Sequence, residues 1–278
     1  MDFNSQKLTI NHAVLDQGFL DLKVNNFLPA FREQNKEEYT IINDLIHLFN
    51  SLEHRFDNTT VSPRDIFLLS CIIELNRLFQ SAVLLFERGI PASANIIIRT
   101  ILELSLNIVE IIKNEDYIQS IIFSEIYEAR KTINHARDFN QLTLIPQEKI
   151  CEIQEIYNSF PKYYPQKLNM KQLAEKNNFK TEYLLYRTYC SNTHTSASTL
   201  AKNFNISSKG MIFDAGIQLG DFKNDVQRLI SIAIIPLPSL INDYFCDDNL
   251  NTTYDLINEN LNRYFAKNSD CNSTRNSQ

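Results

Sequence analysis

The chain has 278 residues, of which 44% are hydrophobic and 22% are charged, and at this length about three quarters of the unfolded surface becomes buried on folding. Only 5 residues are glycine, against about 7% in an average chain. This scarcity argues against Rossmann, P-loop, sandwich and barrel folds, whose turns and phosphate loops depend on glycine. The net charge of −6 at pH 7 argues against a surface that binds nucleic acid or anionic lipid as a whole, although a local basic patch is still allowed.

The five cysteines are scattered and include no Cys-x-x-Cys pair, so we expect neither a disulfide framework nor a zinc site. The first 19 residues lack the basic start and apolar run of a signal peptide. No stretch reaches the roughly 18 uncharged apolar residues that a membrane-spanning helix needs. The sequence therefore predicts a cytoplasmic protein with reduced thiols, no membrane association, no metal and no cofactor.

Apolar periodicity predicts helix over most of the chain. Residues 36–56 carry apolar side chains at the i, i+3, i+4, i+7 spacing of one buried helix face. Ser62 followed by Pro63 is a helix start signal, and we expect this helix to run to Arg88 and to end at Gly89. A second long helix begins at Pro91 and continues through Ile112. Because only two residues join these helices, they should form an antiparallel hairpin.

The rest of the chain is predicted as shorter helices and loops. The expected helices cover about 116–139, 146–157, 170–176, and 181–189 with Thr181 as the N-cap, the last continuing towards 201; a loop covers 158–167. The glycine-containing segment 210–220 is expected to be irregular or a hairpin, a helix over 221–244 should be kinked near Pro236 and Pro238, and a weaker helix covers 253–265.

The expected fold is therefore all-α: a helical bundle with an accessory C-terminal helical part and one short irregular or hairpin segment near residues 205–220. We expect an N-terminal arm over 1–35 and a bundle core that carries the functional motifs over 36–204. An irregular segment and C-terminal helices should follow over 205–267, with a disordered tail over 268–278.

The predicted helix 91–112 carries a narrow polar stripe. Its polar residues, Asn95, Arg99, Glu103, Asn107 and Glu110, follow one another at nearly constant steps of four. One interpretation is a solvent-exposed strip with a weak surface ion pair. The other is a central helix with partly buried charges in a cleft, where buried charges need partners.

Two arginines each precede a histidine at a spacing that suits RNA cleavage without a metal. The histidine can move protons during attack of the 2′-hydroxyl, while the guanidinium stabilises the charged phosphorane oxygens. For Arg130 and His135, a solvated helix face is the preferred interpretation. Arg187 and His194 are the candidate catalytic pair.

The segment around this second pair is rich in hydroxyl groups. Ser191 lies three residues before His194, but no acidic partner or glycine elbow accompanies it, so a hydrogen-bonding role is favoured over a nucleophilic one. Tyr186 belongs to a crowd of tyrosines over 157–189, which either edge the core or form a stacking surface for bases.

The segment Leu84–Glu103 (LLFERGIPASANIIIRTILE) resembles a hallmark of a bacterial helical family, domain-of-unknown-function family 5677. The later pattern Tyr186-Arg-x-x-x-Ser191-x-x-His194 resembles a second motif of that family, and the resemblance covers about residues 66–201. The chain is also distantly similar to HEPN helical bundles, many of which are metal-independent ribonucleases with an Arg and a His in a cleft formed by a dimer. Thr188 departs from the polar Asn, Asp or His that active HEPN members carry after the arginine.

These resemblances imply a HEPN-like metal-independent endoribonuclease, or a toxin-type effector of phage defence. Such a protein would act on RNA as a homodimer, with an antitoxin or other protein as a partner. Arg187 and His194 would be catalytic, with Arg99, Glu103, Ser191 and Tyr186 supporting the site or binding the ligand. The alternative is a non-enzymatic module that senses a ligand or binds another protein.

Overall fold

The computed structural model describes residues 8–11, 23–56, 62–161, 167–193, 204–207, 210–214 and 222–275. The long helices are α1 (Lys23–Gln34), α2 (Lys36–His54), α3 (Pro63–Glu87), α4 (Pro91–Lys113), α5 (Tyr117–Asp138), α6 (Gln147–Ser159), α8 (Lys180–Thr193), α10 (Phe222–Ala233) and α11 (Asp248–Arg275). Shorter elements are the 3₁₀ turn η3 (Leu142–Leu144), α7 (Met170–Asn177) and the π-helix η4 (Ser239–Phe245). Three strands, β1 (Leu8–Asn11), β2 (Phe204–Ser207) and β3 (Gly210–Asp214), complete the order.

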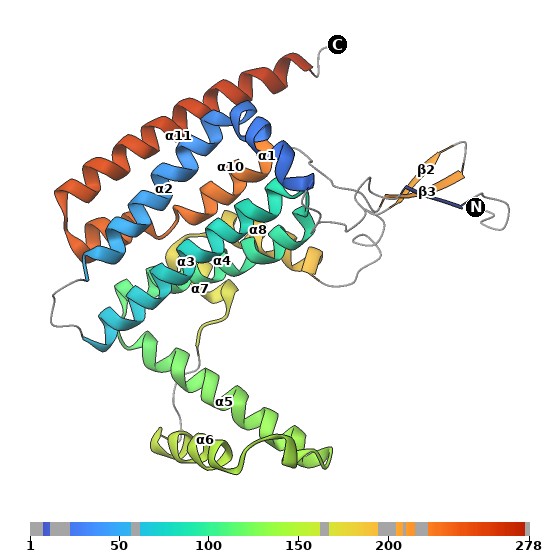
Figure 1. Ribbon diagram of the computed structural model, residues 1–278. Helices are drawn as coiled ribbons and strands as arrows, with labels where there is room; N and C mark the ends of the chain where they lie inside the picture. The colour runs from blue at the N-terminus through green and yellow to red at the C-terminus, as the bar shows by residue number, and fades with distance from the viewer. Residues whose placement is uncertain are drawn as a thin grey trace.

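The helices pack as an all-α bundle, as predicted. In Figure 1, α3 and α4 run through its middle, with α2, α10 and α11 on one side and α7 and α8 on the other. Its core is apolar and fully enclosed, with Phe49, Phe79, Leu75, Ile98 and Leu102 among the side chains that have no more than 1% of their surface exposed. Burial of such apolar surface is the main force that holds the helices together.

The α3–α4 hairpin forms as the sequence predicts. The Ser62 side chain accepts from the Asp65 backbone N–H, the Asp65 carboxylate accepts from the Ser62 N–H, and Pro63 occupies the first turn. At the other end Gly89 has φ 68°. The backbone N–H of Ile90 donates to the Leu85 carbonyl, which closes the helix in the left-handed manner that glycine permits.

Helices α5 and α6 project from the bundle as an arm (Figure 1). They pack on each other around a small apolar cluster of their own, formed by Ile133, Ile150 and Ile153. Because this cluster is separate from the main core, the arm meets the bundle mainly at its base, where α5 follows α4.

Of the two alternatives predicted for 205–220, an irregular segment or a hairpin, the described residues show the hairpin, since β2 pairs antiparallel with β3. The N-terminal strand β1 was not predicted, and it pairs parallel with β3, with Leu8 opposite Met211. Four residues are too few to show an alternating pattern, and the pairing is set by a segment about two hundred residues away in the sequence.

Three boundaries differ from the sequence prediction. Helix α8 begins at Lys180, so Thr181 lies within its first turn instead of capping it; Asn178, at φ 63°, ends α7 and turns the chain directly into α8. The predicted helix 221–244 is broken, with α10 ending at Ala233 and η4 beginning at Ser239, because Pro236 and Pro238 lack donors and disfavour helical backbone before them.

Helix α11 runs to Arg275, whereas the sequence predicts a disordered tail from residue 268. Its earlier turns are anchored to the bundle by Tyr264, which donates to Glu38 at 2.8 Å, and by Lys267, which donates to Glu37 at 2.8 Å. A helix that is already nucleated extends at the cost of fixing one residue for each new hydrogen bond. This explains why polar residues with little periodicity continue the helix.

Stability should fall at alkaline pH because buried acids keep their protons in the native state. Burial raises the pKa of the Cys71 thiol from 9.0 to about 12. Between these values the unfolded chain loses this proton while the native chain retains it, so the unfolded state binds fewer protons and stability falls as pH rises. We expect the free energy of unfolding to drop by roughly 2 kcal/mol between pH 9 and 11 from this group, as measured by urea denaturation.

Cys71→Ala is the matched control, because it removes the thiol and should lessen this slope even if it lowers stability at pH 7; the remaining slope comes from buried tyrosines such as Tyr186, whose pKa is also raised. An unchanged slope in the variant would show that Cys71 does not carry the effect.

Candidate functional site

The polar stripe on α4 lies at the seam where α7 and α8 pack against this helix. Glu110 is fully buried, accepts from Asn177 Nδ2 at 3.0 Å and is ion-paired with Lys176. Lys113 Nζ donates to Asn177 Oδ1 at 2.9 Å. The stripe is therefore not a solvent-exposed strip; at this end it fixes α7 on α4.

About two helical turns before Glu110 on α4, Glu103 forms a polar triad with Arg99 of the same helix and Tyr186 of α8. Arg99 Nη2 donates to Glu103 Oε1 at 2.8 Å, and the Tyr186 hydroxyl donates to the same oxygen at 2.8 Å. The Arg99 guanidinium also donates to the Tyr186 hydroxyl oxygen at 3.2 Å and lies 5.4 Å from the centre of its ring. Two side chains from α4 thus meet one from α8, and Glu103 and Tyr186 are 83 residues apart in the sequence. All three are among the residues that the sequence analysis assigned to the site.

The triad perturbs the protonation of its members. Burial, with hydrogen bonds to Cys190 and Glu103, raises the pKa of Tyr186 to about 12. The hydrogen bond to Tyr186, together with the charge of Glu103, raises the pKa of Arg99. At neutral pH Arg99 is therefore a guanidinium, and Tyr186 is a neutral phenol that donates its proton to Glu103.

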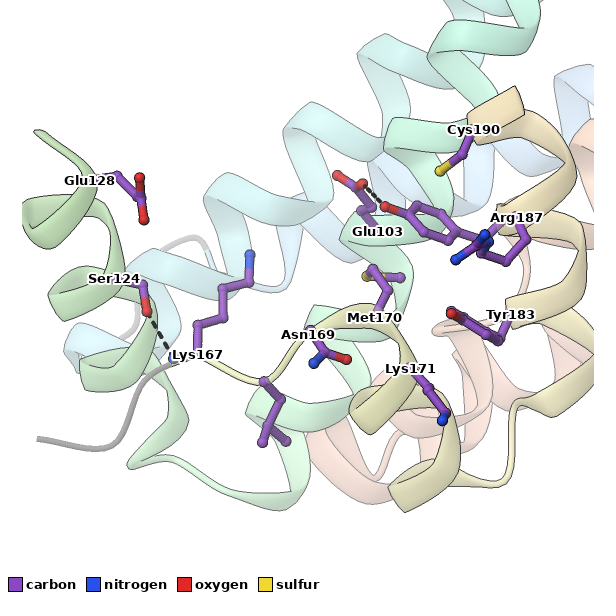
Figure 2. Close-up of a pocket in the computed structure, with 12 residues that line it drawn as sticks. Glu103, Ser124, Glu128, Lys167, Asn169, Met170, Lys171, Tyr183, Arg187 and Cys190 are labelled. Atoms are coloured by element: carbon purple, nitrogen blue, oxygen red, sulfur yellow. Dashed lines mark hydrogen bonds between the residues drawn. The ribbon is translucent and has the colours of Figure 1, made fainter. Parts of the chain in front are cut away.

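An open pocket of about 960 Å³ lies in front of this triad (Figure 2). Its walls come from four places: Glu103 on α4, Ser124 and Glu128 on α5, the connector and first turn of α7 from Lys167 to Lys171, and α8. The side chains that α8 contributes are Tyr183, Tyr186, Arg187 and Cys190. Lys167 is held at the pocket edge by its backbone N–H, which donates to Ser124 Oγ at 2.8 Å.

The charges at the pocket favour an anionic ligand. Both carboxylates are already paired, Glu103 with Arg99 at 2.8 Å and Glu128 with Lys131 at 2.7 Å. Lys167 and Arg187 are exposed and have no ion-pair partner among the residues that the structure describes. A third cation, Lys171, has only a distant partner one helical turn away, at 3.7 Å. The pocket of this acidic protein is therefore locally positive.

The structure brings together four of the six residues predicted for the site. Arg99, Glu103 and Tyr186 make the triad, and Arg187 lies on the adjacent pocket wall. Position 191 lies within α8, but its side chain, like the whole of His194, is outside the described residues, so the predicted Arg–His pair stays a prediction.

Sequence reasoning missed Cys190, Lys167 and Lys171, which also line the pocket. Cys190 lies on the same face of α8 as Tyr186, four residues later, and this spacing could have placed it beside the triad. The two lysines had no such signal, because Lys167 is placed by the contact of the connector with Ser124 of α5 and Lys171 by the packing of α7 on α4.

The other histidine–arginine pair does not form a site. Arg130 lies over the Tyr157 ring at 4.1 Å, whereas His135 is exposed and lies beside Phe139, in agreement with the predicted solvated face. Within the described residues, no group of three or more His, Cys, Asp or Glu side chains could hold a metal ion.

The comparisons with known proteins give one match. The model of a family of unknown function (DUF5677) matches residues 65–211, which is more than half of the chain. No curated protein and no solved structure matches it.

Loss of the tyrosine hydroxyl should weaken the α4–α8 seam. Tyr186→Phe removes one donor from the partly buried Glu103 while Arg99 keeps the other, so we expect the free energy of unfolding to fall by about 1 kcal/mol, as measured by chemical denaturation. Tyr183→Phe is the matched control, since the Tyr183 hydroxyl has no hydrogen-bond partner among the described residues, and its effect should be below about 0.5 kcal/mol. Equal losses in the two variants would contradict the stabilising role of the triad.

Proposed function

The chain belongs to the family of unknown function DUF5677, and from its site we propose that it is a HEPN-like, metal-independent endoribonuclease, acting as a toxin-type effector in bacterial defence. The observation that carries the proposal is the position of Arg187. Its guanidinium lines the pocket (Figure 2) beside the triad, without an ion-pair partner in the described part of the chain. A guanidinium held in this way is available to a substrate phosphate.

The proposed reaction needs only protein side chains. The 2′-oxygen of the RNA attacks the adjacent phosphorus while a base removes its proton, and the bond from phosphorus to the 5′-oxygen breaks as that oxygen takes up a proton. The products are a 2′,3′-cyclic phosphate and a 5′-hydroxyl end. Arg187 would stabilise the negative charge on the phosphorane oxygens, and the sequence assigns the proton transfers to His194, with Ser191 in support.

Location and partners are part of the same proposal. A cytoplasmic homodimer controlled by an antitoxin or another protein would suit an effector of this kind. Of the described helices, only α3 is long and apolar enough to cross a membrane, by length and composition. Its residues Leu68, Ile72 and Phe79 are fully buried in the bundle core, which supports a soluble protein.

A non-enzymatic function is the second candidate, and two observations favour it. The triad satisfies its own charges, as a structural element does. Thr188, next to Arg187, donates its hydroxyl to the Leu184 carbonyl of its own helix at 3.1 Å, so it offers less to a substrate than the more polar residues that active HEPN proteins carry. In this case the pocket binds a small phosphate-bearing ligand without cleaving it.

Purified protein should cleave RNA in the presence of EDTA and leave 2′,3′-cyclic phosphate ends. Arg187→Ala should lower the cleavage rate by about 100-fold or more, because one donor to a developing oxyanion contributes about that much, and His194→Ala should abolish cleavage. Arg77→Ala is the matched control: Arg77 is an exposed arginine on α3 without an ion-pair partner among the described residues, and its loss should leave the rate unchanged.

If RNA stays intact in these assays and nucleotides raise the melting temperature, the ribonuclease proposal is wrong and the non-enzymatic binding function is supported. A ligand at 100 times its Kd adds about 2.7 kcal/mol of stability, and Arg187→Ala should remove the shift. If the protein neither cleaves RNA nor shows a nucleotide-induced shift in melting temperature, both candidates are contradicted.

A further inference from the structure

We propose that Glu103 accepts a hydrogen bond from a ribose hydroxyl of a bound RNA strand, so that the pocket selects ribonucleotides over deoxyribonucleotides. This inference rests on the proposed function, because it assumes that phosphates of the ligand bind at the basic wall of the pocket. It adds a specificity-determining residue on α4 to the residues of α8.

The first observation is the unequal use of the two Glu103 oxygens. Arg99 and Tyr186 both donate to Oε1, each at 2.8 Å, whereas Oε2 accepts no hydrogen bond from any described residue. Figure 2 shows one carboxylate oxygen joined to the tyrosine hydroxyl and the other directed away from it. The Glu103 side chain is 32% exposed and lines the pocket, so Oε2 can be reached by a ligand.

The second observation is that this free acceptor belongs to a pocket that otherwise attracts anions. A carboxylate oxygen next to a phosphate is repulsive unless a donor lies between them. The cations Lys167, Lys171 and Arg187 attract phosphate, and Glu103 therefore requires that the same ligand also carries a donor. A sugar hydroxyl next to a phosphate meets this requirement.

The chemistry of nucleic acids narrows the donor to the 2′-hydroxyl. It is the group by which a protein distinguishes RNA from DNA at a given site, and carboxylates accept from ribose hydroxyls in nucleotide-binding proteins. Arg99 is ion-paired with this carboxylate at 2.8 Å, and a hydrogen bond to a carboxylate is charge-assisted and stronger than one to a neutral acceptor. The triad thus holds an acceptor in a fixed direction before the ligand arrives.

Glu103→Gln separates this role from the structural one. Arg99 and Tyr186 can only donate to Oε1 in the geometry observed, so a glutamine keeps its carbonyl oxygen towards them and turns its NH₂ group to the pocket. The substitution keeps the triad and replaces the free acceptor with a donor. Tyr186→Phe is the complementary variant, because it weakens the triad and leaves Oε2 unchanged.

The test measures Kd by fluorescence anisotropy for three short single strands of one sequence, with ribose, deoxyribose or 2′-fluororibose sugars. The protein carries His194→Ala to prevent cleavage. We expect the ribose strand to bind about tenfold more tightly than the other two, as one hydrogen bond to a charged group allows. With Glu103→Gln the preference should fall below about threefold; with Tyr186→Phe, which leaves Arg99 bonded to Oε1, it should fall less than with Glu103→Gln.

The outcomes separate this inference from the proposed function. If Arg187→Ala weakens binding of all three strands but Glu103→Gln leaves the ribose preference intact, the specificity role is wrong and the phosphate site stands. If Arg187→Ala has no effect on binding, the phosphate site itself is wrong. Should Glu103→Gln fail to fold, Glu103→Asp keeps the charge but withdraws the acceptor, and an undiminished ribose preference in that variant would likewise overturn the inference.

Discussion

Carboxylates that must find partners inside an apolar bundle decide how the helices meet. A buried carboxylate without partners costs several kcal/mol. Two fully buried carboxylates and two partly buried ones are each matched by a tyrosine hydroxyl from another element and by a nearby cation. The four sets are Glu103 with Tyr186 and Arg99, Glu87 with Tyr39 and Arg32, Glu38 with Tyr264 and Lys223, and Asp65 with Tyr244 and Arg64. Because apolar burial is non-directional, these polar sets supply the direction that fixes how far one helix can slide along another.

Helix α4 joins this constraint to the pocket. Glu110 holds α7 and Glu103 holds α8, so one helix sets the positions of both walls that carry Arg187 and Lys171. The opposite wall differs, because Ser124 and Glu128 belong to the arm, whose apolar cluster is separate from the bundle core. The pocket therefore has a rigid side, where the triad lies, and a side that depends on a single helix and its connector.

The sequence predicted the helices well wherever local signals were strong. The cap at Ser62 and the left-handed Gly89 are read from single residues, and the α3–α4 hairpin follows from them. The sequence prediction failed at strand β1, where long-range pairing decides the structure. It also failed at Thr181, where a favourable capping signal was overridden because the sharp turn after α7 starts α8 one residue earlier.

The site residues, too, divide into those with a local sequence signal and those placed only by packing. Arg99 and Glu103 were recognisable because a polar stripe on an apolar helix needs an explanation, and Tyr186 and Arg187 because they follow a family motif. Their mutual contact was a hypothesis that only packing could test. Lys167 and Lys171 could not be identified, because the sequence does not reveal that Ser124 holds the connector, or that Glu110 holds α7, at the pocket.

The acidity of the whole chain and the basicity of the pocket are compatible because the carboxylates at the pocket have their own cations. Glu103 and Glu128 are neutralised by Arg99 and Lys131, so the field that a ligand meets comes from side chains without close partners. Such a field attracts phosphate over about a Debye length, near 8 Å at physiological salt, which gives affinity but little selectivity. Selectivity must then come from groups of fixed direction, and in the described part of the pocket the free oxygen of Glu103 is held in place by two hydrogen bonds to its neighbouring oxygen. The carboxylate that fixes α8 on α4 through one oxygen thus offers its other oxygen to the ligand.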